Sequence, residues 1–164
     1  MSTLAEAIAA IAESQVGIRE TKANGGPQIA AYQTATWLPV GAWPWCAAFV
    51  CWVIQQAIQG RVVSFERPQT AGAWDFERWC RGVDQTVKLR KPTKGDVKRG
   101  DLVIYRFSHI GIATGPPDAN GDVPTVEGNT FGSRSSASGD REGDGVWRKT
   151  RNLSCIRSRI RFSG

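Results

Sequence analysis

The pattern of apolar and polar positions divides the chain into a helical first half and a strand-rich second half. Thr3 and Glu6 match a capping box ahead of a periodic apolar run, and Pro27 suits the first turn of a second helix. The run that follows Pro44 is apolar nearly all round, which is typical of a helix buried by its neighbours. Helices are therefore predicted over about 3–15, 27–36, 45–58 and 69–82.

Beyond Gly100 the pattern changes to that of strands. Short apolar runs separated by turn residues predict strands over 101–107, 109–115, 123–129, 146–150 and 154–162. We interpret the basic stretch 83–99 as a linker and the polar stretch 130–145 as a mobile loop. Helices followed by a mostly antiparallel sheet indicate the α+β class, and 164 residues suit a single domain over 1–164.

Positive charge is concentrated in the second part of the chain. Residues 61–164 contain nineteen basic and twelve acidic residues, and the net charge of the whole chain is +6. Arg157, Arg159 and Arg161 alternate with apolar residues in the last predicted strand, so we expect them to be solvated and to contact an anionic surface. The same charge also permits a role in solubility alone, or nucleic-acid binding. The tryptophans, however, are not interleaved with the arginines as a nucleic-acid platform requires.

The N-terminal segment does not resemble an export signal. It carries Glu6 and Glu13 and lacks the basic residues of a secretory n-region. The chain has no run of 18 or more apolar residues, so no membrane span is expected. We therefore expect synthesis in the cytoplasm without a signal peptide.

Cys46 and His109 are the candidates for catalysis. Cys46 opens the buried helix, and a helix start or a neighbouring imidazolium favours the thiolate. His109, the chain's single histidine, lies between two predicted strands and is the candidate base. Glu127 or Asn129, two apart on the next strand, is expected to accept the second imidazole N–H. Without a CxxC pair we expect no metal site. The remaining cysteines are interpreted as core residues: Cys51, Cys80 and Cys155.

Three motifs in this order, PWCAAFV, GDLVIYRFSHIGIATG and VEGN, resemble the cysteine, histidine-dependent amidohydrolase/peptidase (CHAP) domains. These are papain-like hydrolases found mostly in phage endolysins and bacterial cell-wall enzymes, and the resemblance covers about residues 30–130. It implies Cys46 as the nucleophile, His109 as the base, and Glu127 with Asn129 as the dyad that orients the histidine. It also implies a papain-like fold and hydrolysis of a peptidoglycan amide without a cofactor, as an N-acetylmuramoyl-L-alanine amidase or an endopeptidase.

The chain departs from the family at two points. Many members bind calcium through a D-x-D-G loop ahead of the cysteine, but residues 20–46 contain no aspartate, so no calcium site is expected. We also expect no separate cell-wall-binding domain, and a monomer whose terminal arginines contact the cell surface. The backbone N–H of Cys46 is one expected oxyanion donor, and Trp45 and Gln28 are candidates for the second.

These expectations describe a phage endolysin that is made in the host cytoplasm and acts on peptidoglycan in the periplasm or cell wall. Two alternatives stay open. One is a secreted or injected antibacterial toxin with the same cell-wall chemistry. The other is a basic nucleic-acid-binding module.

Overall fold

A computed structural model describes residues 1–83, 86–93, 95–132 and 143–163. Four helices precede six strands in these ranges, which confirms the α+β class. Most of the stretch 130–145, expected to be a mobile loop, lies outside the described residues. The elements are α1 Leu4–Ser14, α2 Pro27–Gln33, α3 Cys46–Ala57, α4 Asp75–Gly82, β1 Val87–Arg90, β2 Leu102–Tyr105, β3 Ile110–Ala113, β4 Asp122–Thr130, β5 Gly145–Asn152 and β6 Ile156–Phe162.

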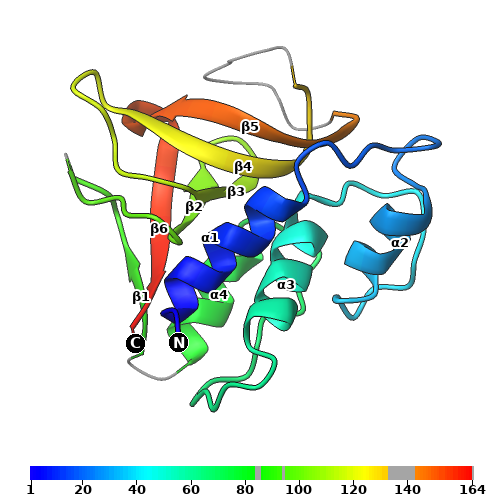
Figure 1. Ribbon diagram of the computed structural model, residues 1–164, viewed down its shortest axis with the longest axis horizontal. Coiled ribbons are helices and arrows are strands. Elements are labelled where there is room, and N and C mark those ends of the chain that lie inside the picture. The colour runs from blue at the N-terminus through cyan, green and yellow to red at the C-terminus, as the bar shows by residue number, and fades with distance from the viewer. Residues whose placement is uncertain (84–85, 94, 133–142, 164) are drawn as a thin grey trace.

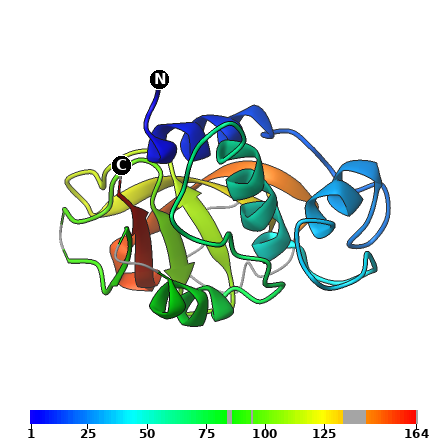
Figure 2. The same ribbon diagram turned by 90° about the horizontal axis from the view of Figure 1, so that it is seen from below.

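The strands form one sheet in the order β1-β6-β2-β3-β4-β5, and every neighbouring pair is antiparallel. The last strand therefore lies inside the sheet, where Ile160 pairs with Leu89 on one side and with Leu102 on the other. Figure 1 shows α1 and α3 packed side by side against the sheet, with α2 beyond α3, and Figure 2 shows the same arrangement from below.

The interpretation of 83–99 as a linker is wrong over its middle, because Val87–Arg90 forms β1. Val87 is buried and Leu89 half-buried, whereas Lys88 and Arg90 are exposed. Two apolar residues among basic ones give too short an alternation to indicate a strand. The strand β1 forms because this segment pairs with β6.

Two buried clusters lie on the two faces of the sheet. Leu102 and Ile104 of β2 pack in the larger cluster, with the helices. Val103 and Tyr105, the residues that alternate with them, pack in a smaller cluster with Val97 and parts of β3, β4 and β6. Since both faces are covered, the middle strands are buried at nearly every position.

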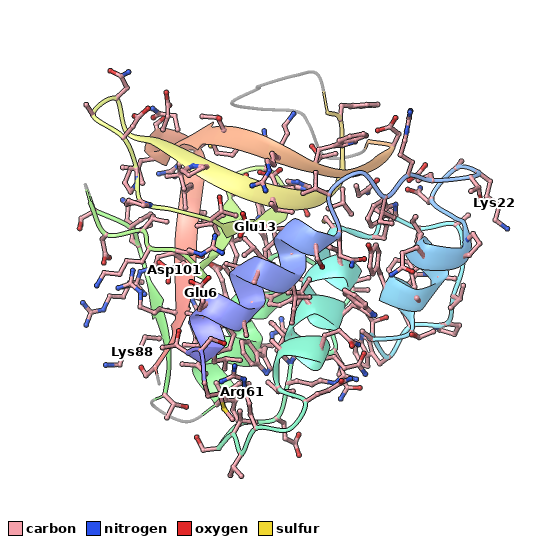
Figure 3. All side chains as sticks on the ribbon, in the orientation of Figure 1. Glu6, Glu13, Lys22, Arg61, Lys88 and Asp101 are labelled. Carbon is pink, nitrogen blue, oxygen red and sulfur yellow. The ribbon has the colours of Figure 1, made fainter. Side chains whose placement is uncertain are left out.

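Ion pairs attach α1 to the rest of the molecule. Glu6 and Glu13 lie along one side of α1, as Figure 3 shows. Arg99, which precedes β2, pairs with both carboxylates, and Arg148 of β5 pairs with Glu13. The N-terminal half of the capping box is confirmed, because the Thr3 hydroxyl accepts a hydrogen bond from the Glu6 N–H at 3.1 Å. No helix in the described ranges is both long and apolar enough to cross a membrane.

The expectation that the three arginines of β6 are solvated is wrong for Arg159 and Arg161. Arg159 is only 3% exposed and Arg161 24% exposed, while Arg157 remains 41% exposed. Both edges of β6 are paired, with β1 and β2, and Asp96 and Asp101 lie against the side chains of Arg159 and Arg161. Each arginine has an acidic partner: Arg157–Glu77 at 2.9 Å, Arg159–Asp96 at 3.2 Å and Arg161–Asp101 at 2.7 Å.

The start of α3 approaches β4 closely at Gly128. A Cβ atom added there would lie 2.7 Å from the Cβ of Phe49 and 2.9 Å from the ring of Trp45. Only a residue without a side chain leaves room for this contact. Gly128 therefore sets the distance between the sheet and the first turn of α3.

We predict that Gly128→Ala lowers the free energy of unfolding by roughly 1–3 kcal/mol, because the methyl group overpacks this contact. Urea unfolding followed by circular dichroism measures the loss. Gly82→Ala is the matched control, since a Cβ there meets nothing within 4 Å and the residue is helical. Equal stability of the two variants would contradict the packing argument.

Candidate active site

Cys46 is the first residue of α3 and is 6% exposed. The N–H groups of the first helical turn have no acceptor within the helix, so they and the helix dipole favour negative charge at this end. Trp45, directly before it, is fully buried, and its indole N–H donates to Glu20 at 2.7 Å. The Trp45 ring also stacks on Tyr32 with centroids 5.7 Å apart. These contacts fix the position at which the helix begins.

His109 lies in the turn between β2 and β3 and is fully buried. Its Nε2 is 2.8 Å from Oε1 of Glu127 on β4, so the structure brings these two predicted residues together. The rings of Tyr105 and Phe107 lie nearly parallel to the imidazole, at centroid distances of 5.6 and 5.9 Å. The ring is therefore oriented by one polar contact at its edge and by two aromatic neighbours.

Glu127 is the centre of a buried polar network that includes three residues not expected from the sequence. Arg151 donates to both carboxylate oxygens, with its Nε at 2.9 Å. The hydroxyl groups of Tyr105 and Thr125 donate at 2.7 and 2.6 Å. Arg151 is fully buried, and its guanidinium lies 5.1 Å from the ring centre of Tyr105. Together with His109, these groups satisfy the hydrogen-bonding capacity of both Glu127 carboxylate oxygens.

The electrostatics of the network favour a charged Glu127 and a charged His109. Burial alone would raise the pKa of Glu127, but hydrogen bonds from Arg151 and His109 hold it well below its usual range. Burial alone would lower the pKa of His109. The charge and hydrogen bonding of the Cys46 sulfur, followed by those of Glu127, outweigh burial and raise that pKa to about 9.

The two nitrogens of His109 therefore have different neighbours. Nε2 is taken by Glu127, while Nδ1 is buried and makes no hydrogen bond of regular geometry within the described residues. This leaves Nδ1 for the interaction with the Cys46 sulfur that raises the pKa of the imidazole. A thiol, an imidazole and a carboxylate thus interact in the order needed to activate a nucleophile.

Asn129 forms no hydrogen bond with His109 among the described residues, whereas Glu127 does. The pairing of β4 with β5 shifts register between Glu127 and Thr130, and Asn129 has a φ of 57°. The alternation that would place Asn129 beside Glu127 is therefore interrupted. Its side-chain oxygen accepts from the Gly143 N–H at 3.2 Å, whereas its Nδ2 is buried without a partner among the described residues.

The side chains of the two residues considered as second oxyanion donors are already engaged. Trp45 donates to Glu20, and Gln28 donates to the side chain of Gln15 at 3.3 Å.

The other three cysteines lack the surroundings of Cys46. All four thiols are free. Burial raises the pKa of Cys51 to about 12 and that of Cys80 to about 11, and it also raises the pKa of Cys155. Cys51 donates to the Thr70 carbonyl and Cys155 to the Asn152 carbonyl. These thiols are held in the protonated form and serve as packing groups.

No cluster of three or more His, Cys, Asp or Glu side chains in the described residues is arranged to hold a metal ion. Comparison of the chain with protein-family models, with curated proteins and with solved structures finds no match.

We predict that the imidazole of His109 titrates with a midpoint near pH 9. Because the chain has one histidine, its ring gives a single set of signals in a ¹H–¹³C NMR titration. In Cys46→Ala the midpoint should be lower, since the negative sulfur no longer favours the imidazolium. A native midpoint near the ordinary value of 6.5 would contradict the contact with Cys46. A raised pKa stabilises the folded state below about pH 6.5, and this contribution is lost as the pH rises through 9.

Proposed function

We propose that the chain is a cysteine-dependent hydrolase that cleaves an amide bond in peptidoglycan. The interactions of His109 with Cys46 and with Glu127 carry the proposal, because they connect a helix-start thiol to an imidazole that a buried carboxylate orients. This geometry supports the proposed reaction type. The substrate class rests on the resemblance of the three sequence motifs to CHAP domains, and with it we propose a papain-like arrangement of the fold.

His109 first takes the proton of the Cys46 thiol, which gives a thiolate and an imidazolium. The sulfur attacks the scissile carbonyl carbon, and the carbonyl oxygen becomes an oxyanion. His109 then gives its Nδ1 proton to the leaving amine, and a thioester remains on Cys46. A water molecule, deprotonated by His109, attacks the thioester, releases the carboxylic acid and restores the thiolate–imidazolium pair. No cofactor takes part in these steps.

Two groups are suited to stabilise the oxyanion. The backbone N–H of Cys46 belongs to the first turn of α3, where the helix dipole favours negative charge. The second is the Nδ2 group of Asn129, a buried donor without a partner among the described residues. Asn129 directly follows Gly128, which contacts the ring of Trp45 beside the nucleophile.

The cleaved bond is that of an N-acetylmuramoyl-L-alanine amidase or of an endopeptidase, and an endolysin is the proposed biological role. An antibacterial toxin would use the same chemistry. Since Arg157, Arg159 and Arg161 are ion-paired, we do not propose nucleic-acid binding, and surface contact would fall mainly to Arg157.

We predict that Cys46→Ala abolishes the lysis of purified sacculi, because loss of a nucleophile costs a factor on the order of 10⁴ or more. Mass spectrometry of the digested muropeptides identifies the cleaved bond from its new termini. Cys51→Ala is the matched control on the same helix, and it should keep activity with a modest loss of stability. If Cys46→Ala retained more than a few per cent of the activity, or if the native protein released no muropeptide, the proposal would fail.

We predict that Arg151→Met lowers kcat/KM by roughly 10²-fold or more, as expected when a group that positions a catalytic set is lost. Without Arg151 the pKa of buried Glu127 rises, and a neutral Glu127 no longer favours the imidazolium, so the pKa of His109 falls below 9. The high-pH limb of the kcat/KM profile should therefore move to lower pH.

Arg148→Met is the control for this substitution, because Arg148 is an arginine of the same strand with 59% of its side chain exposed. Circular dichroism and urea unfolding establish that both variants are folded. Reduced activity with an unmoved pH profile would show that Arg151 supports only stability. This outcome would remove it from the positioning network.

A further inference from the structure

A cavity of about 680 Å³ lies outside the Cys46–His109–Glu127 site. It is bordered by Trp37, by the segment 64–70 and by α4 with Val83. Its size falls in the range of small-ligand sites, and its lining combines aromatic with charged side chains. The residues on which the argument depends are Trp37, Glu66, Gln69, Asp75, Arg78 and Trp79.

Two tryptophans give the cavity its apolar surface. Trp37 is 80% exposed, and its backbone N–H donates to the Gln69 carbonyl at 3.0 Å. Its main chain is thus fixed while its indole stays in water. Trp79 is held on the other side, where its N–H donates to the Glu66 carbonyl at 2.9 Å and its ring packs on Phe65. Single exposed apolar residues are common, but an exposed indole at the border of a cavity is a stacking surface.

The polar groups of the cavity are largely uncommitted. Glu66, Asp75 and Arg78 are exposed and form no ion pair within the described residues. Asp75 accepts only a long hydrogen bond of 3.4 Å from the Thr70 hydroxyl. The cavity therefore offers donors and acceptors beside an aromatic face, with equal numbers of acidic and basic side chains once Arg67 is included.

The cavity is joined to the helix that carries the nucleophile. The thiol of Cys51 on α3 donates to the carbonyl of Thr70, which lines the cavity, at 3.3 Å. Trp37 lies on the segment that leads from α2 directly into Cys46. The cavity is thus lined in part by residues that contact α3 or lie on the segment before it.

We propose that this cavity binds a saccharide and serves as a subsite for the glycan strand of the substrate. A pyranose ring has an apolar C–H face that stacks on an indole, and hydroxyl groups that bond to carboxylates, guanidinium groups and amides. The Trp37 ring supplies the stacking surface. The partners for the hydroxyl groups are the side chains of Glu66, Gln69, Asp75 and Arg78. The identity of the saccharide as peptidoglycan glycan rests on the proposed function, whereas the chemistry of the cavity does not.

Isothermal titration of the protein with tetra-N-acetylchitotetraose tests the proposal without any turnover of an amide. We expect saturable binding, with an affinity at least about tenfold weaker in Trp37→Ala, since a stacked aromatic ring is lost. Trp37→Phe should recover part of the affinity. Leu38→Ala is the matched control, because Leu38 is an exposed apolar neighbour, at 43%, that does not line the cavity.

Each outcome separates this proposal from the proposed function. Saccharide binding that depends on Trp37 supports the subsite even if the protein hydrolyses no peptidoglycan. Lysis of sacculi that depends on Cys46, without binding of the tetrasaccharide, would overturn the subsite and leave the hydrolase intact. Binding unchanged in Trp37→Ala would also overturn it. Trp37-dependent binding of a sugar-free stem tetrapeptide in place of the saccharide would replace it with a peptide subsite.

Discussion

The site depends on the burial of one carboxylate. A charged group without solvent is costly unless it is paired and hydrogen-bonded, and Glu127 receives bonds from Arg151, His109, Tyr105 and Thr125. Room for this network comes from Gly111, because a Cβ there would lie 2.6 Å from the Glu127 side chain. The cost of burying the charge is thus offset by contacts that also hold the histidine in one orientation.

The site also depends on the sheet as a partition between two layers. Cys46 lies on the helical side, where Gly128 lets α3 approach β4. Tyr105 belongs to the opposite cluster. His109 is placed in the turn at the end of β2 and interacts with Cys46 through one nitrogen and with Glu127 through the other. A residue within a strand would reach only one of these layers.

The sequence predicts the helices and the candidate residues Cys46, His109 and Glu127 because local patterns indicate them. Periodicity marks α1, a nearly continuous apolar run marks α3, and short motifs mark Cys46, His109 and Glu127. It does not predict the burial of Arg151 or Arg159, because a charged residue enters the interior only when distant chain supplies its partner. These partners lie 24 and 63 residues away in the sequence. The interrupted alternation at Asn129 likewise depends on pairing with β5, which no local pattern shows.

The place of β6 between β1 and β2 has a consequence for folding during synthesis. A ribosome that has released residues 1–152 has made every member of the proposed catalytic set, yet β2 still lacks its second neighbour and β1 has none. Until β6 is made, β2 is an exposed edge with unpaired backbone groups, and the core lacks Ile160 and Phe162. The sheet that carries the His109 turn is therefore complete only when residues 156–162 emerge and insert. Folding of the site is a late, long-range event of the kind that slows β-rich chains.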